Sequence, residues 1–262
     1  MFKARLLFLS LTLVWTIVCR SDPASFSSTV LGPDSPSSIT LTEQCPACPV
    51  ISPRLPVAEI TPQPDSAVNR TRNILKIVRA TSFPELSNVE IGVRTFRSSS
   101  NYFRTRFSIS RYLTFRKMRL YIEVNPRVFE LGVPEEGVPA IIAHELEHVL
   151  YLSKRNGVEL LSLARLASAN YAARFERGAD LRAIARGYGP GLILYRQWLY
   201  KNVDARTLKE KQKDYFSPDE IEAIQSIIQK QPHTLDYWLR HVPLSMEGIK
   251  KQGSVLTQLE RI

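Results

Sequence analysis

The chain has 262 residues, which is enough for one sizeable hydrophobic core with a tail, and its formal net charge is +10. This basic balance favours attraction to anionic surfaces but says nothing about the fold. All 3 cysteines lie among residues 1–48, so the remainder of the chain cannot carry a cysteine nucleophile.

Residues 1–20 have the pattern of a signal peptide. Lys3 and Arg5 form a basic start, and an apolar run from Leu6 to Val18 follows. This run is shorter than the roughly 20 residues of a membrane-spanning helix and is typical of a signal peptide, with a retained, tilted anchor as the alternative. Cys19 closes the run where a bacterial lipoprotein carries its lipidated cysteine, although the residue before it is not small. We expect an exported protein of the periplasm or outer envelope, membrane-anchored if this segment or Cys19 holds it there.

A proline- and serine-rich segment over residues 21–65 shows no helical or strand periodicity. Such a composition buries too little apolar surface to offset the entropy of ordering, so we expect a disordered tether. Cys45 and Cys48 form a Cys-x-x-Cys pair within it. A local disulfide is the simplest interpretation in an oxidising compartment, and half of a zinc site or a redox pair is the alternative.

The folded domain is expected to span residues 66–262. Apolar residues at helical spacing predict a helix that ends near Ala80. Alternating β-forming residues then predict three or four short strands in a small sheet, mostly antiparallel or mixed. These strands are expected over residues 89–93, 107–109 and 120–124.

The region from Arg94 to Arg119 contains eight basic residues and no acidic one. A solvated sheet face is the simpler interpretation. The functional alternative is contact with an anionic membrane or cell-wall surface, whereas nucleic acid is not expected for an exported protein. The interleaved aromatic residues fit the buried side of strands better than a platform for stacking bases.

The segment His144-Glu145-Leu146-Glu147-His148 carries the clearest chemical signal. Two histidines four residues apart on a helix share one face, so both rings can reach a single metal ion. Glu145 follows the first histidine and can reach a water at the open metal position. This spacing is typical of zinc metallopeptidases. Pro134 and the acids after it predict the start of the helix.

A second long helix is predicted over residues 158–186. A zinc ion with two histidine ligands and an open position needs a third protein ligand, often a carboxylate, and Glu176 is well placed. Asp180 lies on the same face and can accept the other ring N–H of a ligating histidine. Glu159, His233 and His241 are the rival third ligands. The alternative is that both acids are ordinary surface charges.

The remainder of the chain is predicted to be helical. After a glycine-rich turn at residues 187–191, a helix is expected from Leu192 to about Asn202. Ser217, Pro218 and Glu220 have the pattern of a capped helix start.

The combination of His144-Glu145-x-x-His148 with Glu176-x-x-x-Asp180 resembles the gluzincin metallopeptidases of the HtpX and CAAX prenyl protease type, including their periplasmic, lipoprotein-like members. The resemblance covers about residues 66–200. It implies an α+β, zincin-like fold in which the sheet packs on the motif helix and on a second, glutamate-bearing helix. One departure is Glu147, where the family usually has glycine.

Carried over to this chain, the resemblance implies zinc on His144, His148 and Glu176, with Glu145 as the general base. It also implies that Asp180 orients His144. The expected activity is hydrolysis of peptide bonds in a protein or peptide substrate by a zinc-activated water. The residue that stabilises the transition state stays open, and the candidates are His233, His241, Tyr188 and Arg240.

Two other classes were weighed against the peptidase. One is an inactive relative that binds zinc and has a binding or chaperone-like role in the cell envelope. The other is a di-iron carboxylate protein, because Glu145 and His148 also satisfy its Glu-x-x-His rule. That class needs a second Glu-x-x-His, and the chain has none.

Overall fold

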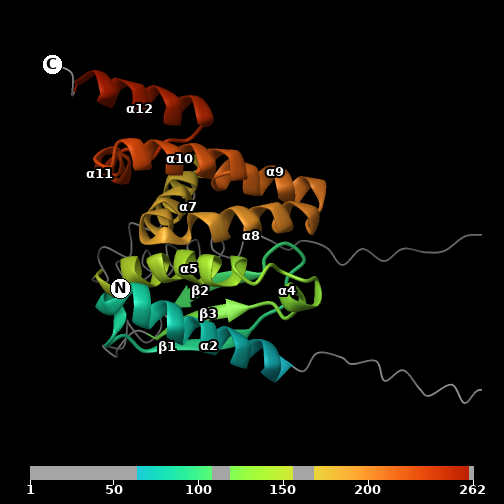
Figure 1. Ribbon diagram of the computed structural model, residues 1–262. Helices are drawn as coiled ribbons and strands as arrows, with labels where there is room; N and C mark the ends of the chain where they lie inside the picture. The colour runs from blue at the N-terminus through green and yellow to red at the C-terminus, as the bar shows by residue number, and fades with distance from the viewer. Residues whose placement is uncertain (1–63, 108–118, 156–167, 260–262) are drawn as a thin grey trace, which may run out of the picture. The chain divides into compact units, whose positions relative to one another are not determined.

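The structure, a computed structural model, describes residues 64–107, 119–155 and 168–259 (Figure 1). The predicted signal segment, the tether and Glu159 lie outside these residues. The described part is an α+β unit, mostly helical, with one small sheet. None of its helices is both long and apolar enough to cross a membrane.

The sheet has three strands in the order β1-β3-β2. β1 (Ile91–Thr95) pairs parallel with β3 (Leu120–Val124), and β2 (Phe103–Phe107) pairs antiparallel with it. The sheet is therefore mixed, which is one of the two expected arrangements, with one parallel and one antiparallel pair rather than mostly antiparallel pairing. β3, last in sequence, enters between the two earlier strands, an order that local periodicity does not encode.

The third strand was predicted correctly, and β1 lies two residues later than the strand predicted over residues 89–93. The strand predicted over residues 107–109 overlaps β2 at Phe107, and its last two residues lie outside the described part of the chain. β2 occupies Phe103–Phe107, where aromatic and arginine residues alternate. Its arginines fit a strand because Glu123 of β3 lies opposite them. Arg104 Nε donates to Glu123 at 2.6 Å, and Arg94 Nε of β1 does so at 2.7 Å. Part of the positive charge of residues 94–119 is thus used within the sheet, and its contact with an anionic surface stays a prediction.

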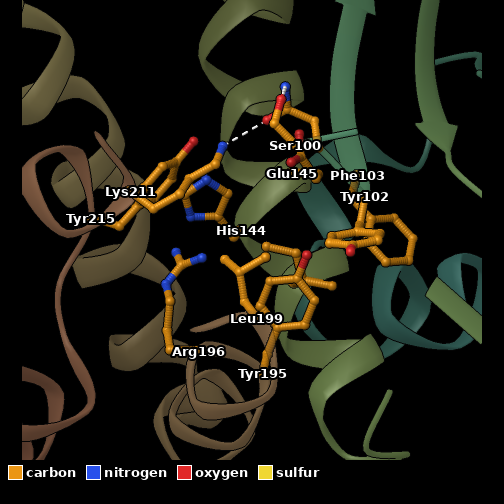
Figure 2. A pocket seen from close by; sticks show the side chains of 12 residues that line it. Ser100, Tyr102, Phe103, His144, Glu145, Tyr195, Arg196, Leu199, Lys211 and Tyr215 are labelled. Atoms are coloured by element: carbon orange, nitrogen blue, oxygen red, sulfur yellow. Dashed lines mark hydrogen bonds between the residues drawn. The ribbon is translucent and has the colours of Figure 1, made fainter. Parts of the chain in front are cut away.

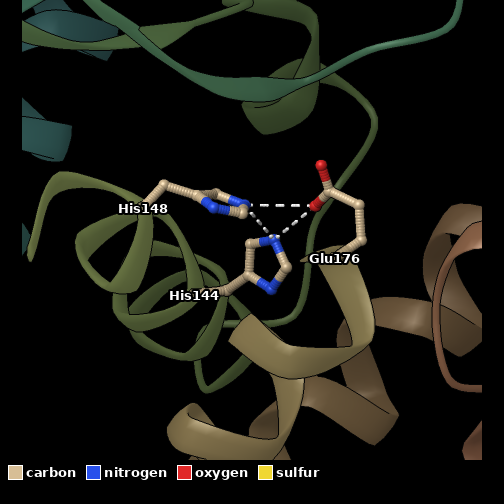
Figure 3. A group of neighbouring side chains, drawn as sticks. All are labelled: His144, His148 and Glu176. Carbon is tan, nitrogen blue, oxygen red and sulfur yellow. Dashed lines mark hydrogen bonds and ion pairs between the residues drawn. The ribbon is translucent and has the colours of Figure 1, made fainter. Parts of the chain in front are cut away.

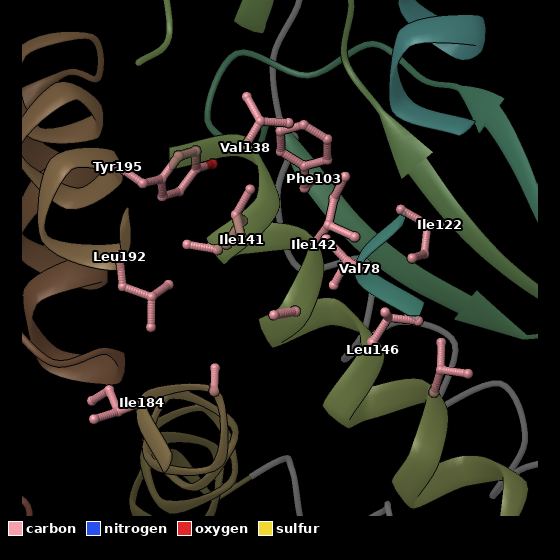
Figure 4. Packing of buried hydrophobic residues seen from close by; sticks show 14 of the residues in the cluster. Val78, Phe103, Ile122, Val138, Ile141, Ile142, Leu146, Ile184, Leu192 and Tyr195 are labelled. Carbon is pink, nitrogen blue, oxygen red and sulfur yellow. The ribbon is translucent and has the colours of Figure 1, made fainter. Parts of the chain in front are cut away.

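Helix α5 (Gly137–Ser153) carries the motif and lies at the centre of the described unit. Fourteen of its 17 residues are buried, as expected for a helix that is apolar on most sides. It packs against the sheet and α2 (Pro64–Ser82) on one side and against α7 and α8 on the other. Figure 4 shows Ile142 and Leu146 beside Ile122, and Ile141 on the side of Tyr195. The helix begins at Gly137 rather than at Pro134, because residues 134–136 form a turn.

Helices α7 (Ala169–Ala183) and α8 (Gly189–Lys201) are joined by a π-helical turn, Ile184–Tyr188. Gly187 in this turn has φ = 91°, in the left-handed region that favours glycine. The predicted helix over residues 158–186 corresponds to α7, and its expected first part falls within residues 156–167, outside the described part. The turn directs α8 back along α5, which it contacts over its length.

The remaining helices are added outside α7 and α8. They are α9 (Ala205–Asp214), α10 (Pro218–Lys230), α11 (Thr234–Arg240) and α12 (Met246–Leu259). The short α4 (Arg127–Glu130) lies earlier in the chain, between β3 and α5. The predicted start of α10 is confirmed as a capping box. Ser217 Oγ accepts from the Glu220 amide at 3.2 Å, and the Glu220 carboxylate accepts from the Ser217 amide at 2.9 Å.

Close packing of α8 on α5 depends on Gly191. A Cβ atom at this position would lie 2.8 Å from Ala140 Cβ and even closer to the carbonyl oxygen of Glu136. Neither atom is the end of a flexible side chain, so α8 would have to move away from α5. The absence of a side chain at Gly191 therefore allows α8, which carries Tyr195 and Arg196, to lie this close to α5.

We expect Gly191→Ala to lower the free energy of unfolding by roughly 1–3 kcal/mol, because the added methyl group overpacks the α5–α8 contact. The measurement is urea denaturation followed by circular dichroism. Gly178→Ala in α7 is the matched control, because its Cβ would meet nothing nearer than 3.5 Å. That variant should be unchanged or more stable by up to about 1 kcal/mol, and equal losses in both variants would contradict the packing argument.

Candidate metal centre

Three side chains from two helices meet at one point (Figure 3). His144 Nε2 and His148 Nε2 of α5 lie 3.1 Å apart, and Glu176 Oε2 of α7 lies 3.2 and 3.1 Å from them. Both histidines are buried, and the carboxylate is partly exposed. Two imidazole nitrogens and one carboxylate oxygen form a group that could hold a metal ion. The three ligands predicted from the sequence are thus brought together.

Asp180 contacts the second ring nitrogen of His144, Nδ1. Its side chain is fully buried, and Oδ1 lies 2.7 Å from His144 Nδ1. With the Nδ1 proton donated to this carboxylate, Nε2 presents its lone pair to a metal. Asp180 also accepts hydrogen bonds from Arg196 of α8 at 3.0 and 3.2 Å, and from the amide of Phe216 at 3.2 Å. The sequence predicted the contact with His144 but not those with Arg196 and Phe216.

The electrostatics of the cluster favour positive charge between the ligand atoms. Burial by itself lowers the pKa of the His144 imidazole, but the charge of Asp180 and hydrogen bonds with Asp180 and Glu176 outweigh it and raise this pKa to about 10. Burial disfavours ionisation of Glu176, yet the charge of His148 and hydrogen bonds with both histidines hold its pKa well below the usual range. Arg196 and His144 likewise keep the pKa of Asp180 low despite burial. The carboxylates of Glu176 and Asp180 are therefore ionised, and their negative charge can compensate that of a bound cation.

The second histidine is oriented by packing. The ring of His148 stacks on Phe175 of α7, with centroids 4.7 Å apart and planes at 19°. Because Phe175 precedes Glu176, the same turn of α7 orients one ligand and supplies another.

Glu145 extends from α5 toward the sheet. It is 5% exposed, and Thr105 Oγ1 of β2 donates to its Oε2 at 2.8 Å. The carboxylate also lines a small pocket together with His144 (Figure 2). Glu145 therefore lies beside the first metal-binding histidine with a fixed orientation. The sequence did not predict the role of Thr105, which a neighbouring strand supplies.

The pocket brings together side chains that are far apart in the sequence. Ser100 and Asn101 come from the β1–β2 connection, Tyr195 and Arg196 from α8, and Lys211 from α9. The rest of its lining consists of Tyr102, Phe103, Ile141, His144, Glu145, Leu199 and Tyr215. Asn125 holds the β1–β2 connection in place by donating to the carbonyl oxygens of Ser98 and Asn101.

The residues that the sequence offered as transition-state stabilisers lie outside this lining. Tyr188 shares a hydrogen bond of 2.8 Å with Ser82, and Arg240 and His241 are exposed at the end of α11. His233, half-buried, precedes α11. Neither His233 nor His241 belongs to the three-residue metal cluster, so Glu176 is the third ligand that the described residues support.

Glu147, two residues after Glu145, is directed toward two arginines rather than toward His144, His148 and Glu176. It is 1% exposed and accepts a hydrogen bond from Arg186 Nε at 2.7 Å, with Arg182 Nε at 3.2 Å. Arg186 also donates to Glu85 at 2.8 Å and to the carbonyl oxygen of Ser82. A glutamate at this position thus links α5 to the end of α7 and to the segment after α2.

Comparisons of the chain with protein-family models, with curated proteins and with solved structures gave no match.

We expect Asp180→Asn to weaken metal affinity about 10- to 100-fold, because the amide removes the negative charge that orients His144 and raises its basicity. The measurement is competition with a coloured chelator. Asp236→Asn, the same change on an exposed residue of α11, is the matched control. Affinity equal to that of the control in a folded Asp180→Asn variant would show that Asp180 does not support the ligand.

Proposed function

We propose that this chain is a zinc-dependent endopeptidase with a zincin-like catalytic unit, acting in the cell envelope. The observation that carries the proposal is the convergence of His144, His148 and Glu176, with Glu145 next to His144 in the lining of the adjoining pocket. Two nitrogens and one oxygen from three side chains form the donor set of many catalytic zinc sites, which leave the fourth position open.

The distances within the cluster fit this metal. In a tetrahedral zinc site with bonds of about 2.0–2.1 Å, neighbouring ligand atoms lie roughly 3.3 Å apart. The three ligand atoms here are separated by 3.1, 3.1 and 3.2 Å. Small rotations of side chains would bring them to tetrahedral spacing. The site can therefore accept zinc without rearrangement of α5 or α7.

The chemistry follows from the residues around the cluster. A zinc ion held by His144, His148 and Glu176 would supply a bound water with a pKa of about 7 and would polarise a substrate carbonyl. Glu145 would accept the proton of the attacking water and pass it to the leaving amine. The hydrogen bond from Thr105 fixes one of its oxygens and leaves the other for this proton. Asp180 lies against Nδ1 of His144, so that Nε2 is the ring nitrogen that faces the other two ligands.

A peptide substrate is supported by β2. Within the described residues this strand pairs with β3 alone, at one edge of the sheet. An extended peptide can add to such an edge through backbone hydrogen bonds. Because Thr105 of β2 bonds Glu145, a peptide bound along this strand would lie next to the general base.

We expect one zinc per chain in the purified full-length protein and loss or strong weakening of binding in Glu176→Ala, because that variant lacks the third ligand. Elemental mass spectrometry after dialysis measures the metal content. Glu222→Ala, an exposed acid on α10, is the control and should keep its zinc. A well-folded wild-type protein without zinc would remove the basis of the proposed function.

We expect Glu145→Gln to retain zinc but lose cleavage of a fluorogenic casein by about 10²–10⁴-fold, because the amide cannot accept the proton of water. Glu147→Gln is the matched control on the same helix, since Glu147 faces the arginines of α7 and the turn after it. The control should lose stability but keep cleavage while folded. Zinc binding without cleavage by the wild type would favour the inactive binding protein instead.

A further inference from the structure

The wall of the pocket opposite Glu145 carries a positive charge from Lys211. This residue lies on α9, a helix that the metal-binding motif does not include, and its ammonium points toward the β1–β2 connection (Figure 2). Lys211 Nζ donates to Asn101 Oδ1 at 2.6 Å and so joins α9 to the β1–β2 connection. The Lys211 side chain is half-buried and lines the pocket.

The charge of Lys211 is not neutralised by direct contact. Besides His144, the ionisable side chains that line the pocket include the basic Arg196 and Lys211 and the carboxylate of Glu145. Arg196 is paired with Asp180 at 3.0 Å. By contrast, the hydrogen-bond acceptor of Lys211 is a neutral amide, and among the residues the structure describes it forms no ion pair within 4.0 Å. An ammonium in such a position attracts a negatively charged ligand.

The aromatic ring of Tyr215 lies close to the Lys211 ammonium. Lys211 Nζ lies 5.2 Å from the centre of its ring, and the Arg196 guanidinium lies 4.4 Å from the same ring. The ring is also 5.8 Å from that of His144. Tyr215 therefore holds Lys211 over the face of the pocket where the first metal-binding histidine lies.

We propose that Lys211 binds the negatively charged oxygen that develops on the substrate carbonyl, with Tyr215 as its positioning residue. This assignment rests on the proposed function and adds the oxyanion-stabilising group. When water adds to the carbonyl carbon, the electron pair of the C=O bond moves to its oxygen, which becomes an alkoxide. The N–H donors of Lys211 then stabilise this charge, and the C=O bond reforms when the amine leaves.

The size of the pocket suits a single oxygen atom, such as one oxygen of a carbonyl or of a bound anion. Its free volume of about 20 Å³ has room for a water-sized group. The position beside both His144 and Glu145 also fits the reacting carbonyl rather than a distant substituent.

The test uses full-length, zinc-loaded protein and inorganic phosphate, a small tetrahedral anion, as the probe in calorimetric titrations. Lys211→Met keeps much of the aliphatic chain but removes the charge. We expect its phosphate dissociation constant to rise at least about tenfold, and its kcat on the fluorogenic casein to fall about 10²–10³-fold with little change in KM. Zinc content should stay at the wild-type level.

Three further variants separate charge from structure. Lys213→Met removes an exposed lysine from the same helix and should behave as the wild type. Lys211→Arg keeps the charge and should restore part of the phosphate affinity. Asn101→Ala removes the hydrogen-bond partner but not the charge, so it should lose much less turnover than Lys211→Met. Equal losses in Asn101→Ala and Lys211→Met would mean that the contact is only structural.

The two proposals fail in different ways. Cleavage and phosphate binding by Lys211→Met at the level of Lys213→Met would overturn the role of Lys211 and leave the peptidase standing. Absence of cleavage by the wild type, with phosphate binding that still depends on Lys211, would overturn the peptidase. In that case Lys211 would be the anion-binding group of a metal-binding protein.

Discussion

The buried carboxylate of Asp180 is the contact on which the arrangement of the site depends. It forms hydrogen bonds with His144 of α5, Arg196 of α8 and the amide of Phe216 before α10. A buried charge is costly unless it is paired and hydrogen-bonded, so these partners must be in place together. One side chain of α7 therefore sets the position of three other parts of the chain. The orientation of His144 in the candidate metal site is therefore a consequence of how the helices pack.

Helix α5 has polar contacts on both sides of its metal-binding face. His144 and His148 face Glu176 and Asp180, whereas Glu147 faces Arg182 and Arg186. Both sets of contacts join α5 to α7 and the turn after it. The two helices are thus connected by charged groups on either side of the metal cluster. This arrangement keeps the histidines and Glu176 in register, and it explains why a buried glutamate is tolerated two residues after Glu145.

The pocket contains side chains from outside the His144–His148 motif, which the packing of other elements brings to it. Its chemistry comes from three places: the motif helix, the edge strand β2 with its preceding loop, and the later helices α8 and α9. Thr105 and Lys211 have no sequence pattern that distinguishes them from other threonines and lysines. A search for a stabilising residue by motif led instead to His233, His241, Tyr188 and Arg240, none of which lines this pocket. Proximity in space, not residue type, identifies Lys211.

The sequence by itself determined the local features of this protein. Helical periodicity, the capping box at Ser217 and the spacing of His144 and His148 depend on neighbours within a few residues. It also offered Glu176 as a third ligand, beside other candidates, and Asp180 on the same helix face. The structure places Glu176 beside both histidines and Asp180 beside His144. Tertiary structure alone decided the insertion of β3 between β1 and β2, the burial of Glu147 and the meeting of Arg196 with Asp180. These depend on contacts between distant segments, whose free energies have no local signature in the chain.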